Sequence, residues 1–134
     1  MELPGDLLYT RDHAWARVEG NVAVIGVTDE LLDMLESVDF VDLPAVGDEL
    51  EMDVECASLH YSGGVYELPA PLTGRVLAVN RLLRNQAEEL HFDPYGAGWV
   101  FKMEFDEPDE VEMLYTRDQY INELEIDNLE MEGP

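Results

Sequence analysis

Basic residues are scarce in this sequence, and lysine is nearly absent. The chain has 31 acidic and 7 basic residues, for a net charge of −24, and Lys102 is its only lysine. Binding to nucleic acid or to an anionic membrane surface depends on clustered Lys and Arg side chains. The sequence therefore predicts no nucleic-acid partner and no membrane partner. Two interpretations of the acidity remain open, a solvated surface that favours solubility and electrostatic steering toward basic partner surfaces, and composition alone favours the first.

Cysteine and long apolar runs are also lacking. Cys56 is the only cysteine, which excludes an internal disulfide and is typical of a reducing compartment. No apolar run approaches the ~20 residues that cross a bilayer. Residues 1–6 lack the cationic and apolar regions of a signal peptide. These features predict a cytoplasmic protein.

The length and apolar content suffice for one folded domain. The 134 residues are 46% hydrophobic, an ordinary value for a globular protein. No long linker interrupts the chain, so we expect a single domain over residues 1–127. The acidic segment 128–134 is expected to be a frayed tail.

Short β-type segments dominate the first hundred residues. Alternating or β-branched runs bounded by turn residues predict strands at residues 14–18, 22–27, 38–43, 49–54, 55–62, 65–68, 75–79 and 99–105. Short strands separated by turns are typical of a compact β-sandwich or barrel with helices at its margins. The sequence therefore predicts a mainly β fold.

Three helical segments are expected beside the strands. Thr28 is a good N-cap residue, and Leu31, Leu32 and Leu35 follow at helical spacing, which predicts a short helix near 29–36. Leucine spacing also indicates a helical turn near 82–90. A C-terminal helix is expected near 109–124.

The segment around Gly63 and Gly64 is the first candidate for a functional element. Adjacent glycines between two β-type runs predict a two-residue hairpin turn. Tyr61, Val65, Tyr66 and Leu68 surround this turn. They could form an exposed contact patch or pack against the sandwich, and the sequence favours neither.

The residues of this segment give little support to metal binding or to catalysis. Cys56 and His60 on a strand would lie ~13 Å apart, whereas ligands of one zinc ion lie within ~4 Å of each other. The acidic neighbours of Cys56 oppose thiolate formation. Ser58 and Ser62 with His60 lack a nucleophile-elbow sequence. We expect no catalytic residue, no metal site and no enzyme activity.

Several motifs resemble, in order and spacing, the H protein of the glycine cleavage system. The similarity covers residues 7–124 and is most specific at residues 93–99, Asp-Pro-Tyr-Gly-Ala-Gly-Trp, followed by Lys102. The other matching motifs are Tyr-Thr-Arg-Asp-His-Ala-Trp at 9–15, Gly-Val-Thr-Asp at 26–29, Phe-Val-Asp-Leu-Pro-Ala-Val-Gly at 40–47 and Ala-Pro-Leu-Thr-Gly-Arg-Val at 70–76, with Asn80.

The resemblance implies a lipoyl/biotinyl-type barrel-sandwich hybrid extended by helices. In that family a lysine at the tip of a hairpin carries lipoic acid through an amide bond. The lipoyl arm receives an aminomethyl group from a decarboxylating subunit and passes it to a folate-dependent subunit. The family members catalyse no step themselves, because the cofactor performs the chemistry and the protein orients it.

The attachment lysine is missing from this chain. Counting without gaps from Pro44 and back from Pro71 places Gly63 on the lipoylated lysine of the family. Glycine has no amine, so we expect no lipoate at Gly63 and no other cofactor. The hairpin is instead the candidate partner-contact segment, and its members are His60, Tyr61, Ser62, Gly63, Gly64, Val65, Tyr66 and Glu67.

The resemblance and the missing lysine lead to a main hypothesis and two alternatives. The main hypothesis is a non-lipoylated scaffold or interaction protein that docks glycine decarboxylase-like, aminomethyltransferase-like or lipoate-transferring enzymes. The first alternative is a true aminomethyl carrier modified at an unusual site. Lys102 is its only lysine candidate, and the strand pattern predicts that this side chain faces solvent. The second alternative is a small-molecule or redox role centred on Cys56, His60 and the tyrosines.

Overall fold

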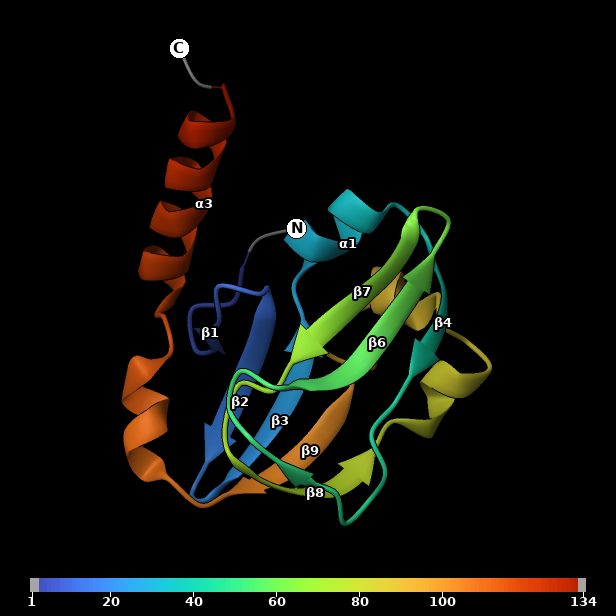
Figure 1. The fold of residues 1–134 in the computed structure, drawn as a ribbon, viewed down its shortest axis with the longest axis vertical. Helices are drawn as coiled ribbons and strands as arrows, with labels where there is room; N and C mark the ends of the chain where they lie inside the picture. Colours follow the sequence, from blue (N-terminus) through green and yellow to red (C-terminus); the bar gives the residue numbers. More distant parts are fainter. Residues whose placement is uncertain (1–2, 133–134) are drawn as a thin grey trace.

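The computed structural model describes the backbone of residues 3–132 and the side chains of residues 3–125. Two antiparallel sheets lie in two layers around one hydrophobic core (Figure 1). In spatial order the larger sheet contains β1 (Leu8–Tyr9), β2 (Ala14–Glu19), β3 (Val22–Val27), β9 (Phe101–Phe105), β8 (Gly74–Val79) and β5 (Glu49–Leu50). The smaller sheet contains β4 (Val38–Asp42), β6 (Glu55–Tyr61) and β7 (Gly64–Pro69). The mainly β prediction is confirmed.

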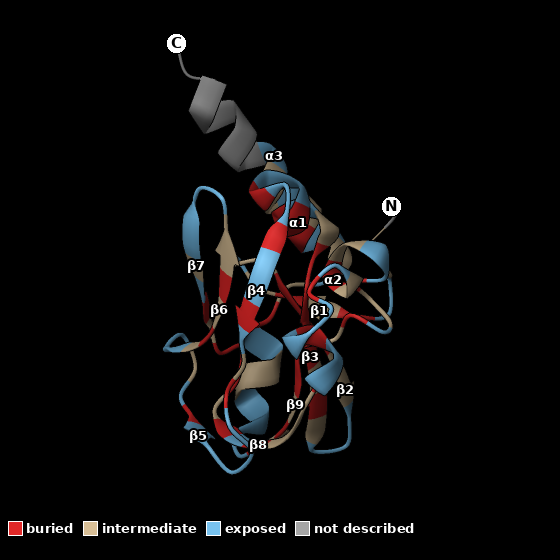
Figure 2. Ribbon diagram, turned by 90° about the vertical axis from the view of Figure 1, so that its right-hand side faces the viewer, coloured by how far each residue is buried: buried red, intermediate tan, exposed pale blue. Residues whose placement is uncertain are grey.

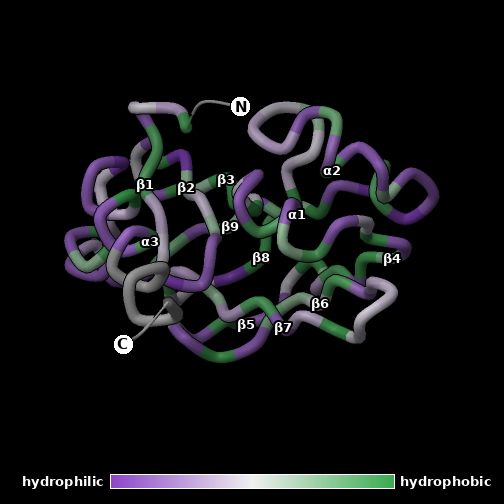
Figure 3. Tube along the Cα trace, turned by 90° about the horizontal axis from the view of Figure 1, so that it is seen from above, coloured by the Kyte–Doolittle hydropathy of each residue, from purple (hydrophilic) through white to green (hydrophobic). Residues whose placement is uncertain are grey.

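Alternation along the strands builds the core between the two sheets. Ile25 of β3, Phe101 and Met103 of β9 and Leu59 of β6 are fully buried, and Figure 2 shows buried segments where the layers meet. Successive strand residues point to opposite faces, so the residues between these positions turn outward. The main core therefore lies between the two layers, and Figure 3 shows hydrophobic segments on strands of both sheets.

One predicted strand is much shorter than expected. The run at residues 49–54 forms strand only at Glu49–Leu50, which pairs with β8. The chain then turns, with a hydrogen bond from the Val54 amide to the Glu51 carbonyl at 3.0 Å and a φ of 70° at Asp53. A left-handed residue cannot continue a strand, so the extended prediction for 51–54 was wrong.

Helix α1 (Asp29–Leu35) confirms the helix predicted near 29–36. The Thr28 hydroxyl accepts a hydrogen bond from the Leu31 amide at 3.3 Å, which is the N-cap interaction expected from the sequence. Leu31, Leu32 and Leu35 are buried against the core. Local capping and leucine spacing thus determine this helix.

The predicted helical turn near 82–90 consists of two shorter elements. A 3-10 helix, η1 (Arg81–Arg84), begins after Asn80, whose side chain accepts a hydrogen bond from the Leu82 amide at 3.2 Å. Helix α2 (Glu89–Phe92) follows after a break. Leu83 and Leu90 anchor the two elements in the core.

The C-terminal helix predicted near 109–124 is confirmed, but it begins later than predicted and is separate from the residues before it. A 3-10 helix, η2 (Pro108–Met113), ends before an extended segment, and α3 (Arg117–Glu132) begins after it. Tyr115 forms a bridge with Tyr9 through backbone hydrogen bonds of 2.7 and 2.8 Å, which holds the segment extended. Thr116 then starts α3, because Thr116 and Gln119 each bond the other's amide.

The first turns of α3 pack on a second, smaller cluster outside the larger sheet. The rings of Tyr120 and Tyr9 stack with their centroids 5.0 Å apart. The Tyr120 hydroxyl lies 2.9 Å from the Thr28 hydroxyl and 2.7 Å from Nδ1 of His13. These contacts connect α3 to the start of α1.

The later part of α3 extends beyond the two sheets (Figure 1). The frayed tail expected at residues 128–134 falls on the last turns of this helix, whose side chains are not described, and on residues 133–134, outside the described range. It stays a prediction. No helix within residues 3–132 has the length and apolar character to span a membrane.

Candidate functional site

The candidate hairpin is formed by β6 and β7, and its turn lies one residue earlier than predicted. Tyr61 pairs with Gly64, so the two turn residues are Ser62 and Gly63. Gly64 closes the turn with a φ of 143°, a conformation that side chains rarely adopt. Of the two glycines, only Gly64 has the positive φ that favours glycine, and it belongs to the first strand pair rather than to the loop.

Tyr61 occupies the space beside Gly63. A Cβ atom placed on Gly63 would lie 2.7 Å from Cε2 of the Tyr61 ring, closer than real Cβ contacts. The backbone of Gly63 does not have a positive φ. The tyrosine ring, and not backbone strain, therefore limits which side chain fits at residue 63 without a rearrangement.

The inner face of the hairpin packs against the body of the protein. Leu59 and Leu68 are fully buried, and Tyr61 packs at the edge of the same core. The Tyr66 hydroxyl donates a hydrogen bond to the Asp12 carbonyl at 2.7 Å, and burial raises the pKa of Tyr66 to about 12. The sequence did not decide whether the residues around the turn pack or form an exposed patch. In the structure, Tyr61, Tyr66 and Leu68 have packing contacts.

The outer face of the hairpin is accessible. Val65 is 46% exposed, and Ser62, Gly63, Gly64 and Glu67 are also exposed. Figure 2 shows these exposed segments on β7 and at the tip. His60 lies on the same face, partly buried beside Phe40 of β4 with ring centroids 5.2 Å apart. The eight predicted contact residues therefore divide between a packed face and an open face.

Phe40 was not among the predicted site residues. It is 48% exposed and pairs with His60 across β4 and β6. The run at residues 38–43 was predicted to form a strand, in which neighbours such as Phe40 and Val41 lie on opposite faces. The sequence did not show which strand this run would pair with, because sheet neighbours depend on tertiary structure.

The thiol of Cys56 is embedded in the hairpin. Its Sγ donates a hydrogen bond to the Leu68 carbonyl at 3.4 Å, and burial raises its pKa to about 12. A thiol with such a pKa is protonated at neutral pH and is a poor nucleophile.

The histidines make separate contacts. Nε2 of His91 accepts a hydrogen bond from the Val38 amide at 3.1 Å, while His13 contacts Tyr120 and His60 lies beside Phe40. Within the described residues, no three His, Cys, Asp or Glu side chains gather as a metal site would require.

Lys102 lies on the larger sheet and not on the hairpin. It pairs with Val24 of β3 and Ala78 of β8. Its Nζ atom lies 5.8 Å from the ring centroid of Trp99, within cation–π range. Phe101 and Met103 beside it are fully buried, whereas Lys102 is partly exposed, so the prediction that it points away from the core is confirmed.

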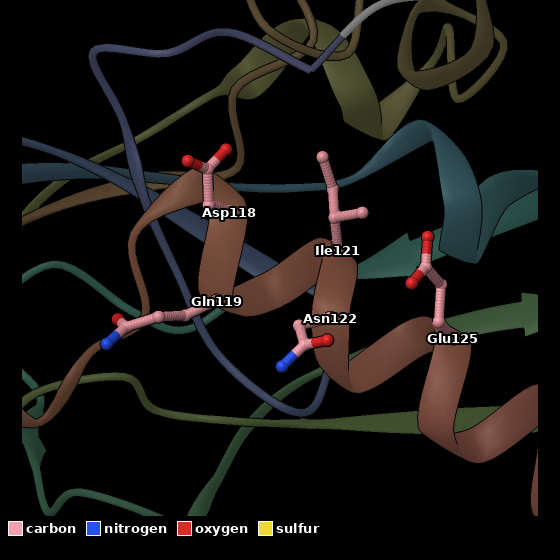
Figure 4. Close-up of a pocket in the computed structure, with 5 residues that line it drawn as sticks. All are labelled: Asp118, Gln119, Ile121, Asn122 and Glu125. Atoms are coloured by element: carbon pink, nitrogen blue, oxygen red, sulfur yellow. The ribbon is translucent and has the colours of Figure 1, made fainter.

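The surface depressions outside the hairpin tip include one on α3 and one beside η2. One runs along α3 and is lined by Asp118, Gln119, Ile121, Asn122 and Glu125 (Figure 4). All five side chains come from one helix, so no second element closes it. The other, of about 480 Å³, lies where the turn at residues 10–13 meets η2. Neither depression is lined by a residue of the hairpin tip.

The two-layered arrangement and its hairpin define a barrel-sandwich of the lipoyl type. A similar solved structure supports this assignment of the fold. The crystal structure of a glycine cleavage system H protein from Mycobacterium marinum superposes with a TM-score of 0.80 at 28% identity, covering 91% of this chain and 98% of that one.

Sequence comparisons identify the family. A family model described as glycine cleavage H-protein matches residues 7–127. The glycine cleavage system H protein of Xylella fastidiosa is 35% identical over 127 residues, 94% of this chain and 97% of that protein. That of Listeria monocytogenes is 39% identical over 120 residues, 90% of this chain and 96% of that protein. The chain belongs to the glycine cleavage H-protein family.

Proposed function

We propose that this chain is a non-lipoylated H-protein-like scaffold, which contacts enzymes of the glycine cleavage or lipoylation systems without carrying an aminomethyl group. One observation carries the proposal. Gly63, at the position that the resemblance assigns to the lipoyl lysine, has no side chain, and the Tyr61 ring occupies the space beside it.

The chemistry of attachment supports this proposal. Lipoate is joined to protein through an amide, which requires a primary amine on the protein. Residues 55–69, the whole hairpin, contain no lysine. The cofactor supplies the reactive group of such a carrier, so a hairpin without an attachment point has no carrier chemistry of its own.

The position of Lys102 also supports a scaffold rather than a carrier. Its side chain lies against Trp99, and its strand has a neighbour on each side, β3 and β8. A carrier arm needs a tip from which it can reach several active sites. Lys102 instead lies within a strand of a six-stranded sheet.

The proposed partners are glycine decarboxylase-like, aminomethyltransferase-like or lipoate-transferring enzymes. A relative of such carriers with a net charge of −24 would be steered toward basic surfaces on these enzymes. The proposed role includes no catalysis, and the protonated thiol of Cys56 supplies no nucleophile at neutral pH. A single free thiol is compatible with a cytoplasmic location.

Intact-mass spectrometry of the protein purified from its own organism tests the absence of modification. We expect the mass of the unmodified chain. A lipoyl group on Lys102, located by peptide mapping, would contradict the proposal and establish the carrier alternative. Calorimetry with the host's purified glycine cleavage and lipoate-transferring enzymes tests the scaffold role, and the absence of binding to all of them would contradict it.

A further inference from the structure

We propose that the outer face of the β4-β6-β7 sheet is a docking surface for a protein partner that presents lysine or arginine side chains around an apolar depression. The identity of the partner rests on the scaffold function proposed above, whereas the surface itself rests on the arrangement of the sheet. We call Phe40, His60 and Val65 the outer row.

The outer row crosses all three strands of the small sheet. Phe40 of β4 pairs with His60 of β6, and His60 pairs with Val65 of β7. The Phe40 and His60 rings meet edge to face, with centroids 5.2 Å apart and an interplanar angle of 60°. Phe40 and Val65 remain 48% and 46% exposed, so the row is an apolar strip that the described part of the chain leaves uncovered.

Carboxylates frame the outer row. Two positions further along the strands, Asp42 pairs with Ser58, and Ser58 pairs with Glu67. The Ser58 hydroxyl donates a hydrogen bond to Oε2 of Glu67 at 2.8 Å, which fixes this carboxylate beside the row. Asp39 is exposed at the irregularity between Val38 and Phe40. The strip is therefore bordered by negative charge.

The charge of the small sheet determines which occupant fits. Its three strands contain four carboxylates, Asp39, Asp42, Glu55 and Glu67, and no lysine or arginine. A second copy of this chain would bring the same carboxylates into contact, and like charges facing each other are unfavourable. A partner surface with an apolar depression ringed by lysine or arginine would cover the strip and pair with its border.

The location of the row connects it with the hairpin tip. Val65 follows Gly64 directly, and His60 precedes Tyr61, the residue that flanks the turn. A partner that approaches the bare tip at Ser62 and Gly63 from the outer side therefore meets the row in its path. The hairpin can in this way contact an enzyme through its own side chains, without a cofactor arm.

Binding measurements with matched variants test the surface. The dissociation constant of the full chain for each purified host enzyme is compared with those of Phe40→Ser and Val65→Ser. Matched controls are Phe92→Ser and Val46→Ser, because these residues lie outside β4, β6 and β7 and are 73% and 60% exposed. We expect each outer-row variant to weaken binding at least about tenfold and each control less than about twofold. Higher salt is expected to weaken wild-type binding.

An NMR titration tests the surface independently of the enzymes. The probe is a short synthetic peptide with one leucine among lysines, and its comparison has serine in place of the leucine. We expect amide shifts on β4, β6 and β7 with the leucine peptide, smaller shifts with the serine peptide, and loss of the shifts in Phe40→Ser.

The outcomes separate the surface from the scaffold function. If no enzyme binds but the leucine peptide shifts the outer row, the scaffold proposal fails and the surface is supported. If an enzyme binds and Phe40→Ser binds equally well, the surface is overturned and the scaffold proposal stands. The surface is also overturned if neither the enzymes nor the leucine peptide affects the outer row. It is likewise overturned if the chain self-associates through Phe40.

Discussion

The ring of Tyr61 lies against the backbone of Gly63, where its Cε2 atom would stand 2.7 Å from a Cβ at residue 63. Gly63→Ala must displace this ring, whereas Gly63→Ala in a Tyr61→Ala background has nothing to displace. We expect a coupling of about 0.5–1 kcal/mol between the two substitutions, measured by urea unfolding of all four proteins. Additive changes would show that the ring does not restrict residue 63.

Supplying an amine at residue 63 is expected to create a lipoylation substrate. Gly63→Lys, incubated with a lipoate-transferring enzyme, lipoate and ATP, should gain one lipoyl group by intact mass, whereas the wild-type chain should gain none. The matched control is Lys102→Arg in the Gly63→Lys background, which should be modified equally. Modification that disappears in this control would place the reactive amine at Lys102 instead.

Gly64 closes the turn with a φ of 143°, and a Cβ added there would meet no atom within 4 Å. Gly64→Ala therefore probes backbone strain without a steric clash. We expect a loss of about 1–3 kcal/mol in the free energy of unfolding, measured in urea. Gly5→Ala is the control, because its Cβ would lie 4.0 Å from Cδ of Arg117, an ordinary contact, and its expected change is within about 0.5 kcal/mol. Equal effects at both sites would contradict the strain argument.

The Tyr120 hydroxyl connects α3 to the body through His13 and the buried hydroxyl of Thr28. Tyr120→Phe removes both hydrogen bonds and keeps the stacking on Tyr9. We expect a loss of about 1–2 kcal/mol in unfolding free energy. Tyr115→Phe is the control, because no hydrogen bond of its hydroxyl is found among the described residues, and a similar loss there would indicate a general effect of removing a phenol.

Burial of Cys56 raises its pKa from 9.0 to about 12, which predicts the direction of a pH effect. The thiol ionises near pH 9 in the unfolded chain but only near pH 12 in the folded one. The stability that it contributes is therefore complete below pH 9 and is lost as the pH rises toward 12. Relative to Cys56→Ala, the wild-type chain should lose unfolding free energy over this range. A constant difference between the two proteins would contradict the burial argument.

Local sequence was sufficient for the elements that are determined by neighbouring residues. Thr28 and the leucines after it predicted α1, and the β-branched run predicted β3 with its observed bounds, Val22–Val27. The break before α3 carried a local signal that the helix prediction overlooked, because Thr116 and Gln119 form a capping box. The pairing of Tyr115 with Tyr9 had no such signal, since 106 residues separate them.

The absence of an amine in the hairpin was determined by the sequence alone, because no fold can supply a side chain that the residue lacks. The motifs around it were likewise enough to predict the family. Only the tertiary structure showed that the Tyr61 ring fills the space at Gly63, and that Phe40 joins His60 and Val65 in one row. Ring positions and strand neighbours depend on packing between distant segments, and no local pattern determines them.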